Sequence, residues 1–330
     1  MTDPPLVSLD DVRAAADRIA PHVRRTPTQT ASSLGELCGT PRLHLKAELF
    51  QRTGAFKFRG VVNTLLQLDA DALARGVCAM SAGNHAAALA LGARQVGTHA
   101  VVVMPSHASV SKVELTRAYG GEVVLVDGPM WPAVQALQAE RGLVLVHPFD
   151  DPRVIAGAGT VGLELLEDVP DVDLVVIPVG GGGLASGVGV VVRALAPKAR
   201  VIGVEPRGAS GMRQALDAGH VVPIDRPTSV ADGLCAPFAG DHTLRHAQAL
   251  LDDVVVVDED EIAAATRLIH QRAKLAAEPA AAAGVAALMR GGLAGPEETV
   301  ACVITGGNVD ASVVSALFAP GVSEGDAVRR

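Results

Sequence analysis

The feature that most constrains this chain is a run of four glycines at the end of an apolar, β-branched segment. Leu174–Val179 is typical of a buried strand, Gly180 to Gly183 follow it, and Leu184–Leu195 is typical of a helix. A strand that turns directly into a helix belongs to a βα unit, so we expect a parallel α/β sheet. Glycines at such a turn let N–H groups converge at the helix N-terminus, where the dipole favours an anion. The turn therefore predicts a phosphate site, and the alternative interpretation is a flexible hinge.

Apolar runs alternate with Ala- and Leu-rich stretches along all 330 residues, as expected of an α/β protein with mostly parallel sheets. We expect residues 73–148 to form a small α/β domain and residues 1–72 plus 149–330 to form a larger one. The expected strands are Val77–Met80, Ala100–Met104, Glu122–Val126, Leu143–His147, Leu174–Val179, Val201–Glu205, Val254–Val257 and Val300–Thr305. The expected helices include Phe58–Leu68, His85–Val96, Ser109–Tyr119, Met130–Glu140, Gly159–Glu167, Leu184–Leu195, Glu259–Gln271 and Ala280–Met289.

Composition argues against several classes of function. A formal charge of −8 and an aromatic content of 2% argue against nucleic-acid binding, because no basic stripe neutralises phosphates and few rings could stack on bases. The N-terminus lacks the pattern of a signal peptide. Pro178 and the glycines interrupt the one apolar run that approaches the length of a membrane span, so we expect no membrane segment. The cysteines are scattered without metal-like spacing and predict reduced thiols in a cytoplasmic protein; they are Cys38, Cys78, Cys235 and Cys302.

A lysine between two phenylalanines is the candidate catalytic group. Phe56, Lys57 and Phe58 follow Gly54 and begin a helix-like stretch. Burial and a helix N-terminus both disfavour the ammonium form and lower the pKa, and a neutral amine forms Schiff bases with carbonyl groups. The alternative is a lysine whose stem covers apolar surface while its ammonium group stays in water. The segment taken alone favours that alternative.

Two further junctions between strand and helix carry polar side chains. The N–H groups and the hydroxyl of Ser81–His85 suit a small carboxylate, although Ser81 or Asn84 could instead cap the helix. Thr305, which precedes two glycines, could hydrogen-bond a ring nitrogen, although the segment alone indicates only a turn. His242 and His246 have i, i+4 spacing without the glutamate of a metalloprotease motif, so we expect a solvated helix face.

These motifs together resemble the fold-type II pyridoxal-phosphate enzymes, in particular the threonine/serine ammonia-lyase (dehydratase) and serine racemase branch. The matching segments cover nearly the whole chain and include Lys46–Lys57, Ser81–His85, Gly180–Leu184, Ala231–Gly233 and Thr305–Asp310. The resemblance implies a tryptophan synthase β-like fold, in which two open, twisted, mostly parallel sheet domains hold pyridoxal 5′-phosphate between them. It also implies a homodimer or homotetramer.

The resemblance implies a role for each motif. Lys57 would form the Schiff base with the cofactor and act as the catalytic base, Asn84 would hydrogen-bond the cofactor's 3′-oxygen, and Thr305 would meet the pyridine nitrogen. The implied cofactor-binding residues are Phe56, Lys57, Asn84, Gly180, Gly181, Gly182, Gly183, Leu184 and Thr305. The implied substrate-binding residues are Ser81, Ala82, Gly83, Asn84, His85 and Phe149.

The resemblance predicts β-elimination of L-threonine and/or L-serine to 2-oxobutyrate or pyruvate plus ammonia. Ala82 stands where the racemases carry a serine acid/base, and Phe149 where they carry an asparagine, so both favour a dehydratase. Glu205 and the Ala209 carbonyl fit the branch's cation site, but Gly211 replaces its aspartate, and we predict no metal. A serine racemase or a hydroxyaspartate-type dehydratase is the alternative, and a silent binding protein is a third. The chain ends soon after the catalytic core, so no C-terminal regulatory domain is expected.

Overall fold

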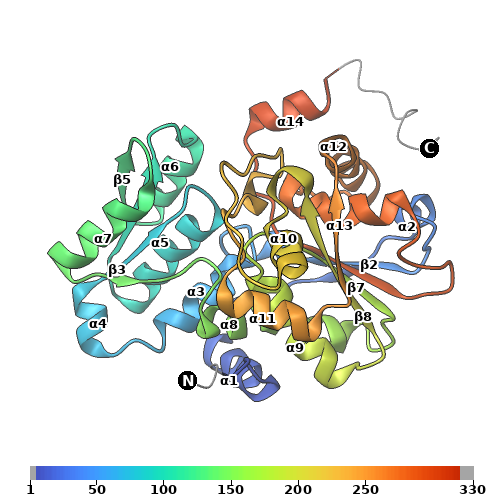
Figure 1. Ribbon diagram of the computed structural model, residues 1–330, viewed down its shortest axis with the longest axis horizontal. Coiled ribbons are helices and arrows are strands. Elements are labelled where there is room, and N and C mark those ends of the chain that lie inside the picture. Colours follow the sequence, from blue (N-terminus) through green and yellow to red (C-terminus); the bar gives the residue numbers. More distant parts are fainter. Residues whose placement is uncertain (1–4, 320–330) are drawn as a thin grey trace.

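The computed structural model describes residues 5–319 and contains two sheets that lie side by side (Figure 1). The six-stranded sheet has the order β1-β2-β10-β7-β8-β9, and the four-stranded sheet has the order β5-β4-β3-β6. Neighbouring strands pair in parallel except β1 with β2. The α/β fold class is therefore confirmed. The strands are β1 Thr28–Thr30, β2 Leu43–Ala47, β3 Val77–Met80, β4 Ala100–Pro105, β5 Glu122–Val126, β6 Val144–Leu145, β7 Leu174–Pro178, β8 Arg200–Pro206, β9 Asp253–Val257 and β10 Val300–Ile304.

Helices connect the strands and cover the faces of both sheets (Figure 1). The α-helices are α1 Leu9–Ile19, α2 Ser32–Leu37, α3 Lys57–Leu65, α4 Ala70–Arg75, α5 Asn84–Val96, α6 Val110–Ala118, α7 Met130–Arg141, α8 Pro152–Asp168, α9 Gly183–Leu195, α10 Gly211–Ala218, α11 Asp241–Leu250, α12 Glu259–Leu268, α13 Pro279–Arg290 and α14 Ala311–Leu317. Short 3₁₀ turns lie at η1 Glu48–Phe50, η2 Arg207–Ala209 and η3 Asp232–Leu234, and a π-helical turn lies at η4 Ile269–Ala273.

The larger sheet is buried on both faces. Along β7, Leu174 and Val176 pack into the core that includes α12 and α13, whereas Val175 and Ile177 pack into the core that includes α8 and α9. Successive side chains of a strand point to opposite faces, so a strand covered on both sides needs apolar residues at every position. This explains the continuous apolar run that precedes the four glycines.

The structure changes the bounds of several expected elements. The strand expected at Leu143–His147 is only Val144–Leu145, because the next carbonyl, of Val146, binds the side chain of His85. The helix expected from Gly159 begins at Pro152, since Asp151 caps it by accepting a hydrogen bond from the N–H of Arg153.

The bounds of two expected helices are also corrected, and two strands lie outside the expected set. The helix expected at Phe58–Leu68 is Lys57–Leu65, and the one expected at Glu259–Gln271 ends at Leu268, where the backbone changes to the π-helical turn. Strands β1 and β2 are not among the expected strands: β1 has only three residues, all polar, and β2 places the charged Lys46 at a buried position.

All strands of the smaller sheet lie between Val77 and Leu145, inside the block expected to form a separate domain, whose exact limits stay a prediction. The residues before and after this block supply the larger sheet. None of the helices within residues 5–319 is both long and apolar enough to cross a membrane.

Candidate active site

Lys57 is the first residue of α3 and lies beside the end of β10. The N–H of Phe56 donates to the carbonyl of Thr305 at 3.0 Å, and the N–H of Gly307 donates to the carbonyl of Gly54 at 2.9 Å. The loop before α3 and the loop after β10 are thus tied together. They bring Lys57 and Thr305, which are far apart in the sequence, to one place.

The amine of Lys57 is held against the interior of the protein. Its Nζ donates to the carbonyl of Pro148 at 2.8 Å and lies 5.1 Å from the centroid of the Phe56 ring. Burial lowers the pKa of Lys57 from 10.5 to about 8. The neutral fraction near pH 7 is therefore greater by roughly two orders of magnitude than for an ordinary lysine, as a Schiff-base lysine requires.

The glycine turn at the start of α9 is packed closely on its side-chain side. A Cβ at Gly181 would lie 2.3 Å from the ring of Phe149, and one at Gly182, whose φ is +94°, would lie 2.6 Å from Cε of Met212. The hydroxyl of Thr243 donates to the carbonyl of Gly181 at 2.7 Å. These contacts disfavour the flexible-hinge interpretation. The first N–H groups of a helix have no partner within it, so those of α9 are available to an anion.

The segment Ser81–His85 contains the turn after β3 and the first two residues of α5. The hydroxyl of Ser81 accepts a hydrogen bond from the N–H of Gly83 at 3.2 Å, and no described side chain caps α5. The helix-capping interpretation of Ser81 and Asn84 is therefore wrong. A Cβ at Gly83 would meet nothing within 4 Å. The open space and the N–H groups of the first turn of α5 suit a small carboxylate.

His85 contributes a neutral ring to this segment. Its Nε2 lies 2.9 Å from the carbonyl of Val146, and a carbonyl can only accept, so the proton is on Nε2. Burial, together with the charge of Lys57, lowers the pKa of His85 to about 3. Its Nδ1 is buried and has no hydrogen-bond partner among the described residues, which leaves it able to accept a hydrogen bond from a ligand.

Asn84 is held by two residues that the sequence did not suggest as functional. Its Nδ2 donates to Oε1 of Glu278 at 2.7 Å, and its Oδ1 accepts from Nδ2 of Asn308 at 2.8 Å. Burial raises the pKa of Glu278 to about 7. In the sequence, Glu278 is an acidic residue before a helix-starting proline, and Asn308 is part of the motif after β10; neither signal identifies Asn84 as the partner.

Phe149 stands against the glycine turn. Its ring is edge-on to those of His147, at 4.7 Å between centroids, and of Phe238, at 5.8 Å. The contact with Gly181 places Phe149 beside the predicted phosphate site.

Two other groups lie outside this arrangement. Glu205 is buried, and both carboxylate oxygens accept hydrogen bonds at 2.8 Å from the N–H groups of Met212 and Arg213 at the start of α10. In the described part of the chain no three His, Cys, Asp or Glu residues gather as metal ligands.

His246 is only 1% exposed, and its Nε2 accepts a hydrogen bond from the N–H of Val7. The expected solvated face is therefore wrong at His246, because the N-terminal segment covers it.

Comparisons with known proteins all identify the same family. A family model described as "Pyridoxal-phosphate dependent enzyme" matches residues 19–306. An L-threonine ammonia-lyase of Thermotoga maritima is 40% identical over 320 residues, which cover 96% of this chain and 79% of that protein. A beta-hydroxyaspartate dehydratase of Paracoccus denitrificans is 39% identical over 304 residues, which cover 91% of this chain and 96% of that protein. The structure of maize serine racemase matches with a TM-score of 0.90 and 38% identity, covering 94% of this chain and 97% of that one.

Proposed function

The chain belongs to the family of pyridoxal-phosphate dependent enzymes, and on that premise we propose that it deaminates L-threonine and/or L-serine by β-elimination. The products are 2-oxobutyrate or pyruvate, plus ammonia. The observation that carries the proposal is the amine of Lys57, which donates to the carbonyl of Pro148 at 2.8 Å, has a lowered pKa and acts electrostatically on His85, three residues after Ala82. Alanine can neither donate nor accept a proton, so Lys57 is left as the base at Cα. The L-threonine ammonia-lyase of Thermotoga maritima, similar over 96% of this chain, also supports the proposal.

The residues of the site fit pyridoxal phosphate. Gly180 to Leu184 would hold the phosphate, because the side-chain side of the turn is filled by protein and the N–H groups of α9 are available. Phe56 would lie along the ring, Asn84 would meet the 3′-oxygen, and Thr305 would meet the ring nitrogen. When bound, the cofactor withdraws electrons from Cα of the amino acid and so acidifies its Cα–H.

Residues of this chain would bind the substrate carboxylate, take the Cα proton and contact the ring nitrogen. The N–H groups of Ser81–His85 would bind the substrate carboxylate. Nζ of Lys57 would take the Cα proton, since its lowered pKa gives it a neutral fraction near neutral pH. Thr305 is a hydroxyl residue, which cannot hold a ring nitrogen protonated as a carboxylate would. Loss of the β-hydroxyl is therefore favoured over chemistry that needs a long-lived carbanion at Cα.

Gly181→Ala is expected to weaken binding of pyridoxal phosphate by about tenfold or more, because its Cβ would collide with the Phe149 ring and displace the N–H groups that receive the phosphate. Titration of cofactor-free protein measures this affinity. Gly295→Ala is the matched control, since its Cβ would meet only Glu298 at 3.7 Å. Adding Phe149→Ala to the Gly181→Ala chain should restore part of the affinity. Unchanged affinity in Gly181→Ala would contradict this role for the turn.

Ala82→Ser is expected to raise racemisation of L-serine by about tenfold or more. The serine hydroxyl would supply the missing acid/base on the face of the cofactor opposite Lys57. Chiral chromatography of serine after incubation measures the rate. Ala139→Ser, on the exposed surface of α7, should leave it unchanged. Equal racemisation in wild type and Ala82→Ser would refute the argument from the missing base.

Product analysis tests the proposed function directly. Purified protein with pyridoxal phosphate should form 2-oxobutyrate from L-threonine or pyruvate from L-serine, with one ammonia per 2-oxo acid. D-serine without either 2-oxo acid would indicate a racemase. Turnover of 3-hydroxyaspartate alone would indicate the dehydratase activity named for the Paracoccus denitrificans relative.

We also propose a cytoplasmic homodimer or homotetramer. The location is supported by the cysteines, whose thiols are all free, as is usual in a reducing compartment. The assembly is expected from the family resemblance alone.

A further inference from the structure

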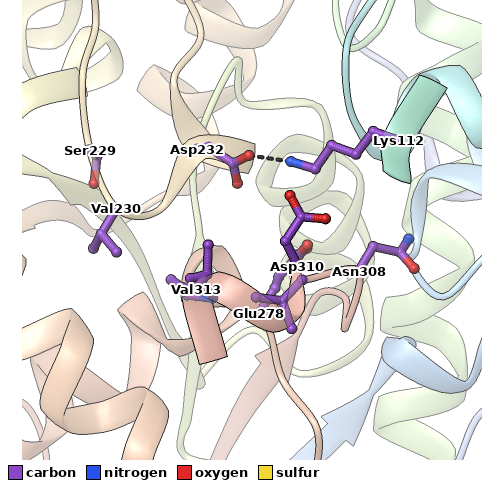
Figure 2. Close-up of a pocket in the computed structure, with 10 residues that line it drawn as sticks. Lys112, Ser229, Val230, Asp232, Glu278, Asn308, Asp310 and Val313 are labelled. Atoms are coloured by element: carbon purple, nitrogen blue, oxygen red, sulfur yellow. Dashed lines mark hydrogen bonds and ion pairs between the residues drawn. The ribbon is translucent and has the colours of Figure 1, made fainter. Parts of the chain in front are cut away.

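Both ends of the side-chain amide of Asn84 are held by residues from loops beside the larger sheet. Asn84 begins α5, after the three-residue turn that follows β3 of the smaller sheet, whereas Glu278 precedes α13 and Asn308 follows β10 of the larger sheet. Figure 2 shows Glu278 and Asn308 together on the wall of a cavity of about 280 Å³. Lys112 of α6 and Asp232 of η3 line the same cavity and form an ion pair (Figure 2).

The orientation of the Asn84 amide follows from one backbone carbonyl. Nδ2 of Asn308 donates to the carbonyl of Thr53 at 2.7 Å, and a carbonyl can only accept. The same amino group donates to Asn84, so the atom of Asn84 that faces it must be Oδ1. Nδ2 of Asn84 then faces Glu278, whose Oε1 accepts. One N–H of Asn84 remains without an assigned acceptor in this chain of hydrogen bonds.

Each partner of Asn84 packs against a glycine. A Cβ at Gly306 would lie 2.4 Å from Oε1 of Glu278, and a Cβ at Gly54 would lie 2.5 Å from Oδ1 of Asn308. Glu278 is only 3% exposed. A reversed amide would place its Nδ2 against Nδ2 of Asn308 and lose that hydrogen bond, so Asn84 keeps one orientation.

We propose that Glu278 and Asn308 are positioning residues that keep Asn84 with its remaining N–H toward the 3′-oxygen of pyridoxal phosphate. This inference rests on the proposed role of Asn84. A donor fixed toward an oxygen stabilises its ionised form more than its protonated form. Because the amide presents an N–H and not its oxygen, the site stabilises the ionised 3′-oxygen over the hydroxyl form.

The test compares Glu278→Met, which removes the acceptor, with Glu278→Gln, which keeps a carbonyl acceptor. Glu278→Met should weaken pyridoxal phosphate binding about tenfold and shift the absorbance spectrum of the bound cofactor and its pH titration. Glu278→Gln should stay within about twofold of wild type in affinity and keep the wild-type spectrum. Glu140→Met, on an exposed position of α7, is the control for the substitution itself.

The affinity and the spectrum of Glu278→Met and Glu278→Gln are then measured in chains that also carry Asn84→Ala. If Glu278 acts through Asn84, adding Glu278→Met to Asn84→Ala should change affinity and spectrum little further, because coupled residues are not additive. Equal effects of Glu278→Met in both backgrounds, or an unchanged spectrum in Glu278→Met, would overturn the inference and leave Glu278 a purely structural residue.

Different outcomes test the role of Glu278 and Asn308 and the proposed β-elimination. If Asn84→Ala keeps the wild-type spectrum and affinity while wild type forms a 2-oxo acid, the inference is wrong and the function stands. If the Asn84–Glu278 coupling is found while neither 2-oxobutyrate nor pyruvate appears, the inference stands and the function is wrong.

Discussion

Lys57→Ala is expected to lower formation of 2-oxo acid from L-threonine and L-serine by roughly 10³-fold or more. The change removes the base at Cα, and a general base contributes about 10²–10⁴-fold on its own; it also removes the only proposed covalent link to the cofactor. The bound cofactor should lose the absorbance band of the lysine-linked form, and borohydride should no longer fix cofactor to the chain. Steady-state kinetics and the absorbance spectrum before and after reduction measure both effects.

Lys198→Ala is the matched control, because Lys198 is exposed in the loop after α9. It should keep both the activity and the covalent fixation. Substantial activity in Lys57→Ala would contradict the assignment of the base. Covalent fixation that persists in Lys57→Ala would contradict the assignment of the Schiff-base residue.

Arg59→Met is expected to lower the free energy of unfolding by about 3–5 kcal/mol, because removing one partner of a buried ion pair leaves an uncompensated charge in the interior. Nη2 of Arg59 lies 2.8 Å from Oε1 of Glu48, and Nη1 lies 2.7 Å from Oε1 of Glu164. Glu164 is also paired, at 2.7 Å, with the buried Nζ of Lys46. Urea unfolding of the cofactor-free protein measures the change.

Arg141→Met provides the comparison, since Arg141 and its partner Glu122 are 42% and 48% exposed. Its loss should change the free energy of unfolding by less than about 1 kcal/mol. If the two variants unfold at the same urea concentration, the cluster around Arg59 does not stabilise the fold. Because Arg59 lies in the first turn of α3, its loss should also weaken cofactor binding at Lys57.

The buried ion pairs show why part of the fold could not be predicted. Strand β2 alternates apolar residues with His44 and Lys46, a pattern that by itself predicts a strand with one face in solvent. In the structure Lys46 is buried, because Glu164 of α8 neutralises it and the carbonyl of Thr26 accepts from its Nζ. A charged residue is compatible with a buried strand only when its partner is present, and that partner lies far away in the sequence.

The distance in sequence between interacting residues separates what the sequence determined from what only the tertiary structure decided. The α/β class, the glycine turn and the reactive lysine are patterns of neighbouring residues, so the sequence was sufficient to predict the class and to propose Lys57. The partners of Asn84 come from loops beside the larger sheet, and Glu278 is separated from Asn84 by 194 residues. Hydrogen bonds between such distant residues leave no periodic or local signal, because they form only where the two sheets meet. The fold therefore decided the orientation of Asn84, the closely packed side of the glycine turn and the charge balance around Arg59.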